Sequence, residues 1–206
     1  LKMYTPDIYK NENQEEIKQF LQENSFGILI NQTNGKLCAT HIPLELDRNK
    51  EGKQILHGHI AKENPQWRGF EENDTVLAVF SGPHSYISSS WYDHENVPTW
   101  NYLAVHVYGK IKIIEGEAAI NSLKKLVDKY EKNSQNPVKI EDLSSKTLRQ
   151  VRGIVAFEIE ITSIEATKKL SQNRDENNYK NIISELEKTQ DQASIAVATE
   201  MKKCPR

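Results

Sequence analysis

The stretch FGILINQTNGKLCATHIPLEL, residues 26–46, decides the fold class. A first apolar run from Phe26 to Ile30 is followed by the pair Asn34-Gly35, and a second run returns from Lys36 to Leu46. Two such runs around an Asn-Gly pair are a strong hairpin signal, because both turn residues accept the positive φ angles of a tight turn. The sequence therefore predicts an antiparallel strand pair here.

Other segments on both sides of this hairpin predict further strands. We expect these strands at residues 54–60, 76–80, 102–115 and 153–164. Gly82-Pro83 is expected to end the strand at residues 76–80, and residues 84–101 are expected to be irregular. Gly109 inside the long alternating strand suggests a bulge or a tight bend.

Helices are expected mainly at the start, in the middle and at the end of the chain. Amphipathic periodicity predicts them at residues 13–24, 117–131 and from Arg174 onward, with short helices within 61–72 and 144–151. The last helix weakens into Ala193–Thr199, and the final residues are expected to be frayed. Six or seven close strands with peripheral helices indicate a mainly β, α+β fold built on a small barrel.

Composition excludes several classes of function. The 206 residues contain 27 Lys and Arg against 29 Asp and Glu, a net charge of −2, which disfavours a protein held to nucleic acid by charge. No apolar run approaches the ~20 residues that a membrane span needs. No signal-peptide pattern opens the chain, and Met3 after Leu1-Lys2 is the expected native start. Only Cys38 and Cys204 are present, so we expect no disulfide framework and a reduced, cytoplasmic setting.

The segment His57-Gly58-His59-Ile60-Ala61-Lys62 is the first candidate for chemistry. On a strand His57 and His59 face the same way and could hold a metal, but no third ligand has a recognisable spacing, so no metal is expected. The alternative is a pair of hydrogen-bonding histidines in a polar pocket. Lys62, before a helix start at Asn64-Pro65, could meet a phosphate or could be an ordinary surface lysine.

Two aromatic stretches are the other candidates. Residues 82–92 and 97–102 read GPHSYISSSWY and VPTWNY, in which hydroxyl donors alternate with flat rings. Such residues can hydrogen-bond the edge of a polar heteroaromatic ligand and stack on its face. The alternatives are a loop pinned to the core by two aromatics and plain core packing of Trp100. Nucleotide-loop, nucleophile-elbow and zinc-protease motifs are absent from the sequence.

These segments together resemble one bacterial family, PaiB. The resemblance rests on ordered blocks that span nearly the whole chain: Met3–Pro6, His59–Trp67, Phe80–Ser88, Trp91-Tyr92, Val97–Tyr102 and Lys169–Arg174. It implies the FMN-binding split barrel, shared with pyridoxamine-phosphate oxidases and flavin reductases. It also implies a homodimer with FMN at the interface, and a negative transcriptional regulator linked to protease synthesis and sporulation.

The same resemblance implies a set of site residues. The FMN phosphate would be held by Thr40, His41, His59 and Lys62. The isoalloxazine would be edged or covered by residues of the 86–102 segment, which are Tyr86, Ser88, Trp91, Trp100 and Asn101. No residue constellation identifies a catalytic group.

Three functions follow as hypotheses. The first is a flavin-binding regulator that acts indirectly or through its flavin. The second is an enzyme on the same barrel, either an FMN-dependent oxidoreductase or a haem-handling relative that uses a histidine. Direct DNA binding is the least favoured, because the sequence contains no helix-turn-helix pattern and no basic arm. We expect residues 1–170 to form the barrel domain and residues 171–206 a C-terminal helical extension packed on the barrel or on a dimer partner.

Overall fold

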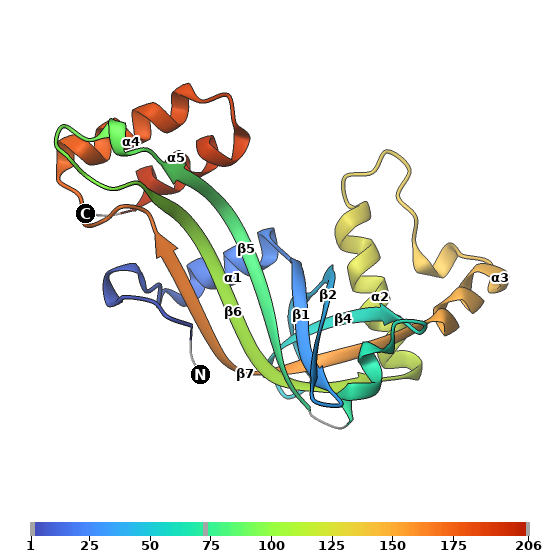
Figure 1. Cartoon of the computed structure of the whole chain (residues 1–206). Coiled ribbons are helices and arrows are strands. Elements are labelled where there is room, and N and C mark those ends of the chain that lie inside the picture. Colours follow the sequence, from blue (N-terminus) through green and yellow to red (C-terminus); the bar gives the residue numbers. More distant parts are fainter. Residues whose placement is uncertain (1–2, 72–73, 205–206) are drawn as a thin grey trace. The chain divides into compact units, whose positions relative to one another are not determined.

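The structure is a computed structural model that describes residues 3–71 and 74–204 (Figure 1). Its strands are β1 (Phe26–Thr33), β2 (Lys36–Pro43), β3 (Glu45–Arg48), β4 (Gln54–Ala61), β5 (Thr75–Ile87), β6 (Thr99–Ile114) and β7 (Ile154–Lys169). Its α-helices are α1 (Gln14–Glu23), α2 (Gly116–Glu131), α3 (Ser145–Leu148), α4 (Glu176–Lys188) and α5 (Gln192–Lys203). Short 3₁₀ helices are η1 (Asp7–Tyr9), η2 (Pro65–Phe70), η3 (Ser89–Trp91), η4 (Ile140–Asp142) and η5 (Arg149–Gly153).

The strands form one seven-stranded sheet in the order β2-β1-β5-β6-β7-β4-β3. The predicted hairpin is confirmed, because β1 and β2 pair antiparallel from Phe26↔Pro43 to Thr33↔Lys36. Asn34 and Gly35 both have positive φ angles, 51° and 74°, as this two-residue turn requires. The mainly β architecture with peripheral helices is therefore as predicted.

The described chain divides into two compact units. Residues 21–80 and 107–164 form the first, which we call the barrel unit. Residues 1–20, 81–106 and 165–206 form the second, the terminal unit. The long strands β5, β6 and β7 contribute residues to both units. The division predicted at residue 170 remains a prediction.

The barrel unit has a core of large apolar side chains that are fully buried. They come from several strands and include Leu29, Leu44, Leu56, Phe80 and Phe157. Phe70 of η2 contacts Phe157 edge to face, with ring centroids 5.5 Å apart. Gly109 of β6 permits a close approach to β7, because a Cβ at this position would come within 2.5 Å of the Glu160 carbonyl oxygen.

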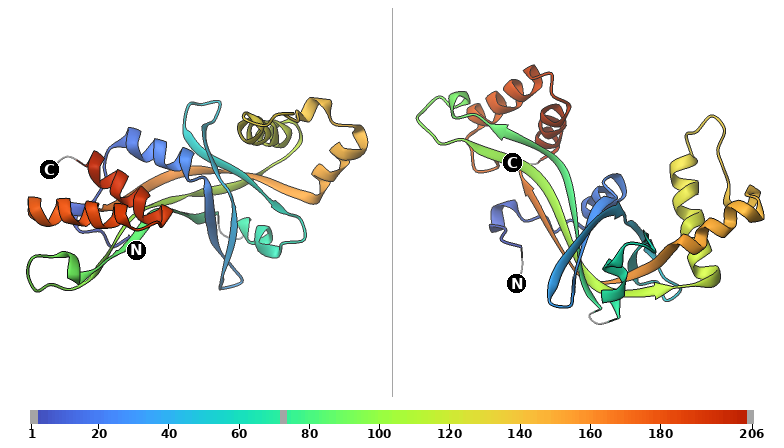
Figure 2. Two further views of the ribbon diagram at one scale, coloured as in Figure 1. Left: turned by 90° about the horizontal axis from the view of Figure 1, so that it is seen from above. Right: turned by 45° about the vertical axis from the view of Figure 1, so that its right-hand side comes forward.

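The terminal unit has a separate core made by α4, α5 and the residues around the turn between β5 and β6. Its buried members are Ile87, Tyr92, Leu170, Tyr179, Ile182, Leu186, Val197, Ala198 and Met201. Helices α4 and α5 lie side by side, as Figure 2 shows. The aromatic segment in which the ligand is expected therefore also contributes Ile87, Trp91 and Tyr92 to the packing of the C-terminal helices.

Two expectations about strand ends were wrong. Strand β5 continues through Gly82-Pro83 to Ile87, and β6 begins at Thr99, so the irregular segment is shorter than residues 84–101. Pro83 is tolerated because the pairing of β5 with β1 covers only Leu77 to Val79, which leaves residue 83 outside that ladder. A Cβ on Gly82 would also meet the Phe20 ring at 2.5 Å, so the glycine makes room for α1.

The expected weakening of the last helix was also wrong. Helix α5 is continuous from Gln192 to Lys203, and the Asp191 side chain caps it by accepting a hydrogen bond from the Ser194 amide. The fraying predicted for the chain end concerns mainly residues 205–206, which lie outside the described part, as do Leu1 and Lys2. No helix in the described ranges has the length and apolar character needed to cross a membrane.

Candidate functional site

A polar cluster joins strand β2 to helix η2 in the barrel unit. Asn64 Nδ2 donates to Thr40 Oγ1 over 2.9 Å, and the Thr40 hydroxyl lies in hydrogen-bonding contact with Gln66 Oε1. Gln66 is buried, and its amide nitrogen donates to the Leu29 carbonyl over 3.0 Å. The fold thus places Thr40 beside the segment that follows β4, which is the segment that contains Lys62.

Lys62 lies at the end of β4 with an exposed side chain. In residues 3–71 and 74–204, its ammonium has no carboxylate within ion-pair distance. Its backbone is fixed, because its amide donates to the Gly153 carbonyl over 2.8 Å and its carbonyl accepts from Trp67 Nε1 over 2.9 Å. Lys62 therefore carries an unpaired ammonium on an ordered backbone segment that also contains Asn64.

The two histidines predicted for the phosphate site are placed differently. His41 follows Thr40 on β2, so its side chain lies on the opposite face of that strand, where its exposed ring is 6.4 Å from Phe26. His59 lies on β4 and is half-buried, and this burial lowers its pKa. Thr40 and the segment around Lys62 are brought together directly, whereas His41 borders them from the other side of β2.

The helix start after Lys62 contributes less than expected. Helix η2 is a short 3₁₀ segment, and Asn64 Oδ1 already accepts the hydrogen bond of the Gln66 amide. Pro65 has no amide hydrogen to offer. An anion at this place would therefore be held by side chains, because the helix terminus has few free N–H groups.

The side chains of this cluster suit a phosphate group. Asn64 uses one amide hydrogen on Thr40 and keeps a second one, and Lys62 adds an unpaired ammonium. Amide and ammonium hydrogens are donors that phosphate oxygens accept, and hydrogen bonds to a charged partner are the stronger ones. The single hydroxyl hydrogen of Thr40 is donated to Gln66 Oε1, so Thr40 positions Asn64. The donor set therefore fits a phosphorylated ligand.

An exposed aromatic surface lies on the terminal unit. It is formed by His84 and Tyr86 of β5 and Trp100 of β6, and we call it the aromatic surface. The Trp100 ring centroid is 6.0 Å from that of Tyr86 and 6.2 Å from that of His84. Tyr86 is 47% exposed and Trp100 51% exposed, so both rings can contact a flat partner.

The remaining predicted residues of this region have structural roles. Ser88 caps η3 by accepting the Ser90 amide, and Trp91 packs against the terminal core. Asn101 is fully buried, and its amide group is bonded to Ser171 Oγ and Met201 Sδ. The cofactor role expected of Asn101 remains a prediction, and in this structure its side chain is enclosed beside α5.

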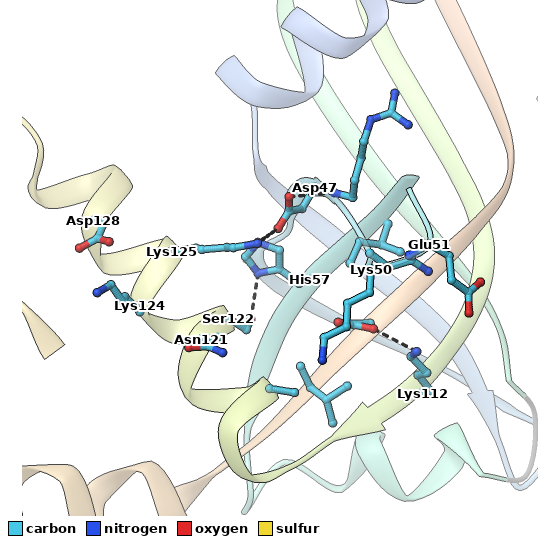
Figure 3. A pocket seen from close by; sticks show the side chains of 16 residues that line it. Asp47, Lys50, Glu51, His57, Lys112, Asn121, Ser122, Lys124, Lys125 and Asp128 are labelled. Carbon is cyan, nitrogen blue, oxygen red and sulfur yellow. Dashed lines mark hydrogen bonds and ion pairs between the residues drawn. The ribbon is translucent and has the colours of Figure 1, made fainter. Parts of the chain in front are cut away.

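A second polar site, not anticipated as a unit, lies under helix α2 in the barrel unit (Figure 3). His57 of β4 is 4% exposed, and its Nδ1 lies 2.9 Å from Ser122 Oγ. Its Nε2 lies 3.9 Å from Asp47 Oδ2, and Asp47 is bonded to Lys125. Burial lowers the pKa of His57. The 3.9 Å separation is too long for a hydrogen bond, so Ser122, His57 and Asp47 do not form a catalytic relay.

Sequence reasoning missed two sets of residues. The sequence placed Asn64 and Gln66 at a helix start and gave them no site role. Asn before Pro is a helix-capping signal that could have identified Asn64 as a candidate. Asp47, Ser122 and Lys125 gave no signal, because Asp47 lies far in the chain from the two α2 residues and meets them only when α2 docks. The paired histidines have separate environments, and no group of three metal-ligating side chains occurs among residues 3–71 and 74–204.

The hairpin β1–β2 presents an apolar outer face. Phe26 is 65% and Leu37 80% exposed, and the half-buried Ile28 and Ile30 lie on the same side of β1 as Phe26. Ala39, which pairs with Ile30, is exposed as well. A contiguous apolar sheet face of this kind marks an interaction surface more often than isolated exposed residues do.

The comparisons with known proteins agree with this geometry. A protein-family model described as "Putative FMN-binding domain" matches residues 3–163. The protein "Protease synthase and sporulation protein PAI 2" of Bacillus subtilis is 49% identical over 186 residues, which cover 90% of this chain and 89% of that protein.

Solved structures show the same fold. An FAD- and haem-binding protein of Mycobacterium smegmatis superposes with a TM-score of 0.61 at 15% identity, covering 83% of this chain and 78% of that one. The flavocytochrome Anf3 of Azotobacter vinelandii also gives 0.61, at 17% identity, covering 87% and 78%. The predicted split barrel is confirmed by these superpositions, and FMN is confirmed as the cofactor by the family match. The chain belongs to the PaiB family of FMN-binding split-barrel proteins.

Proposed function

We propose that this protein binds FMN and acts as a negative regulator of gene expression, with the bound flavin as the sensing element. The observation that supports it most is the hydrogen bond between Asn64 and Thr40, which joins strand β2 to the segment that contains Lys62. The regulatory role extends the name of the Bacillus subtilis relative, which refers to protease synthesis and sporulation.

In this proposal Lys62 and Asn64 donate to the phosphate, Thr40 positions Asn64 at the same site, and His41 and His59 lie at its border. Tyr86 and Trp100 are the residues of the aromatic surface that would contact the isoalloxazine, since their rings are exposed and flat. When bound, FMN supplies a group that accepts one or two electrons, which gives the protein a way to respond to redox state.

Binding of FMN can be measured by titrating the full chain and following flavin fluorescence. Lys62→Ala should raise the dissociation constant roughly tenfold, because a charged hydrogen bond to phosphate is lost. Lys36→Ala is the matched control, since Lys36 is an exposed lysine on the same strand as Thr40. Unchanged FMN affinity in both Lys62→Ala and His59→Ala would refute the phosphate assignment.

Direct DNA contact is not part of the proposal. The net charge is −2, and several exposed lysines are paired with carboxylates, for example Lys53 with Glu160 at 2.9 Å and Lys110 with Asp74 at 3.0 Å. Electrostatic binding to DNA requires free cations, and its strength falls steeply with salt. A salt-sensitive mobility shift on promoter DNA would contradict an indirect route.

We also propose that the protein is a homodimer that pairs through the apolar face of β1–β2. Burial of Phe26, Leu37 and their neighbours against a second copy would remove that face from water, which is favourable at ~25 cal/mol per Å². The two free cysteines, Cys38 and Cys204, are consistent with the reducing cytoplasm, where we place the protein.

A further inference from the structure

A cavity of about 600 Å³ lies in the barrel unit, beside helix α2 (Figure 3). Its walls are the β3–β4 turn, strands β3, β4, β6 and β7, and residues 118–128 of α2. None of the nine residues predicted for the flavin lines it. Its volume is within the range of small-molecule sites.

The lining selects a charged, polar ligand. Side chains of both charges face the space from the turn, the strands and the helix, among them Lys50, Lys112, Lys125 and Glu158. An apolar molecule would desolvate these groups without compensating them, at a cost of several kcal/mol for each charge that lost its hydration. The occupant therefore has to offer charge or hydrogen bonds.

The pairing of the charges indicates the sign of the ligand. Asp47 is bonded to Lys125, and Glu158 Oε2 lies 3.1 Å from Lys112 Nζ, so these two carboxylates are already neutralised. Lys50 has no ion-pair partner within residues 3–71 and 74–204. Figure 3 shows its side chain extending into the space between the strands and α2. Among the lining groups without an ion-pair partner in the described residues, Arg48 and Lys50 are cations and Asp128 is a carboxylate, so the unpaired charge is positive on balance and favours an anion.

The turn that holds Lys50 is ordered. Asn49 Oδ1 accepts hydrogen bonds from the amides of Glu51 and Lys53, each 3.0 Å long, and Arg48 donates to the Gly52 carbonyl over 2.6 Å. The lysine backbone is thus fixed before a ligand arrives, which reduces the entropy that binding must pay.

The helix side of the cavity offers uncharged donors. Asn121 and Ser122 are neighbours on α2, and both line the space. Within the described chain the Asn121 amide has no hydrogen-bond partner, whereas Ser122 is oriented by His57 at 2.9 Å. The opposite end of α2 is anchored to β3 by Lys129, whose Nζ donates to Glu45 Oε2 over 2.6 Å. The donors therefore belong to a helix whose position is already set.

We infer that this cavity is a second ligand site, which binds a small organic anion with a carboxylate or phosphate group. Lys50 Nζ pairs with the anionic group, and the Asn121 amide and Ser122 hydroxyl bind its polar remainder. The site is separate from the flavin site and does not depend on it.

The test uses the full chain with FMN bound, titrated calorimetrically at constant ionic strength with citrate, with inorganic phosphate and, as a blank, with chloride. Saturable binding of citrate or phosphate is expected. The anion that binds more tightly shows whether the site prefers a carboxylate or a phosphate group. Lys50→Ala should weaken that binding roughly tenfold, the loss of one charged hydrogen bond, while FMN affinity stays unchanged. Lys50 is exposed, so its removal should leave the fold intact.

Lys36→Ala is the matched lysine control and should bind the anion as the unmodified chain does. Asn121→Leu, an exposed position on α2, tests the helix side and should also weaken binding. Equal anion binding by the Lys50→Ala and unmodified chains, or competition between the anion and FMN, would overturn the inference. Lys62→Ala should lower FMN affinity and leave anion binding intact. This result separates the two proposals, because it changes one site without the other.

Discussion

Asn64 donates a 2.9 Å hydrogen bond to the hydroxyl of Thr40 and thereby joins edge strand β2 to the turn that follows β4. Thr40→Val removes this bond and leaves Gln66, which is buried, without one of its partners. The free energy of unfolding should fall by about 1–3 kcal/mol, the cost of an unsatisfied buried polar group. FMN affinity should fall with it, and Thr40→Ser should restore both, as measured by urea unfolding and flavin titration. A valine variant with unmodified stability and affinity would show that the bond has neither role.

The aromatic surface gives a second prediction. Trp100→Ala should lower FMN affinity roughly fivefold through lost stacking, which contributes ~1 kcal/mol for an aromatic pair. Stability should change little, because half of the Trp100 side chain is already in water. Trp100→Phe should retain most of the affinity. If Trp100→Ala binds FMN as tightly as the unmodified chain, the aromatic surface does not contact the flavin.

Asn101 should behave in the opposite way to its neighbour Trp100. Asn101→Ala removes the bonds to Ser171 and Met201 inside the terminal core. We expect a loss of about 1–3 kcal/mol in the free energy of unfolding. The fraction of folded protein should still bind FMN with normal affinity, measured well below the unfolding midpoint. A large affinity loss without destabilisation would instead support the predicted role of Asn101 in the cofactor site.

Dimerisation is tested at Leu37, whose side chain is 80% exposed on the β1–β2 face. Leu37→Glu should shift the protein from dimer to monomer, because a carboxylate would have to be buried in the interface. Val138→Glu is the matched control at an exposed apolar position beyond α2. Sedimentation at micromolar concentration distinguishes the two states. A dimer that persists in Leu37→Glu would place the interface elsewhere.

Stability should fall as the pH falls through the range in which histidine titrates. Burial lowers the folded-state pKa of His57, His59 and His106 below the ordinary value of 6.5. The unfolded chain then binds more protons than the folded chain below that value, so the stabilisation is complete above pH 6.5 and is progressively lost under it. His57→Gln should reduce the difference between unfolding free energies at about pH 7.5 and 5.5. An unchanged difference would mean that His57 does not take part.

The local sequence was sufficient for elements whose signals are short-range. The Asn34-Gly35 turn fixes the first hairpin, and the alternation from Tyr102 onward fixes most of β6, because turn geometry and residue alternation depend on adjacent residues alone. The ordered blocks were also enough to identify the family and its cofactor, since they occur along the chain in a fixed sequence. The extension of β5 through Pro83 could not be foreseen, because it depends on where the pairing with β1 stops.

The site required the tertiary structure. The sequence alone pointed to Thr40 and Lys62, but the hydrogen bond from Asn64 that links their segments forms only when β2 and η2 pack together. Trp100 and Asn101 are adjacent in the sequence, which does not indicate which of them is exposed. They lie on opposite faces of β6, so Trp100 is an exposed ring and Asn101 a buried amide. Likewise Ser122 reaches His57 only because α2 docks on the strands, since contacts between distant residues are decided by packing and not by the local chain.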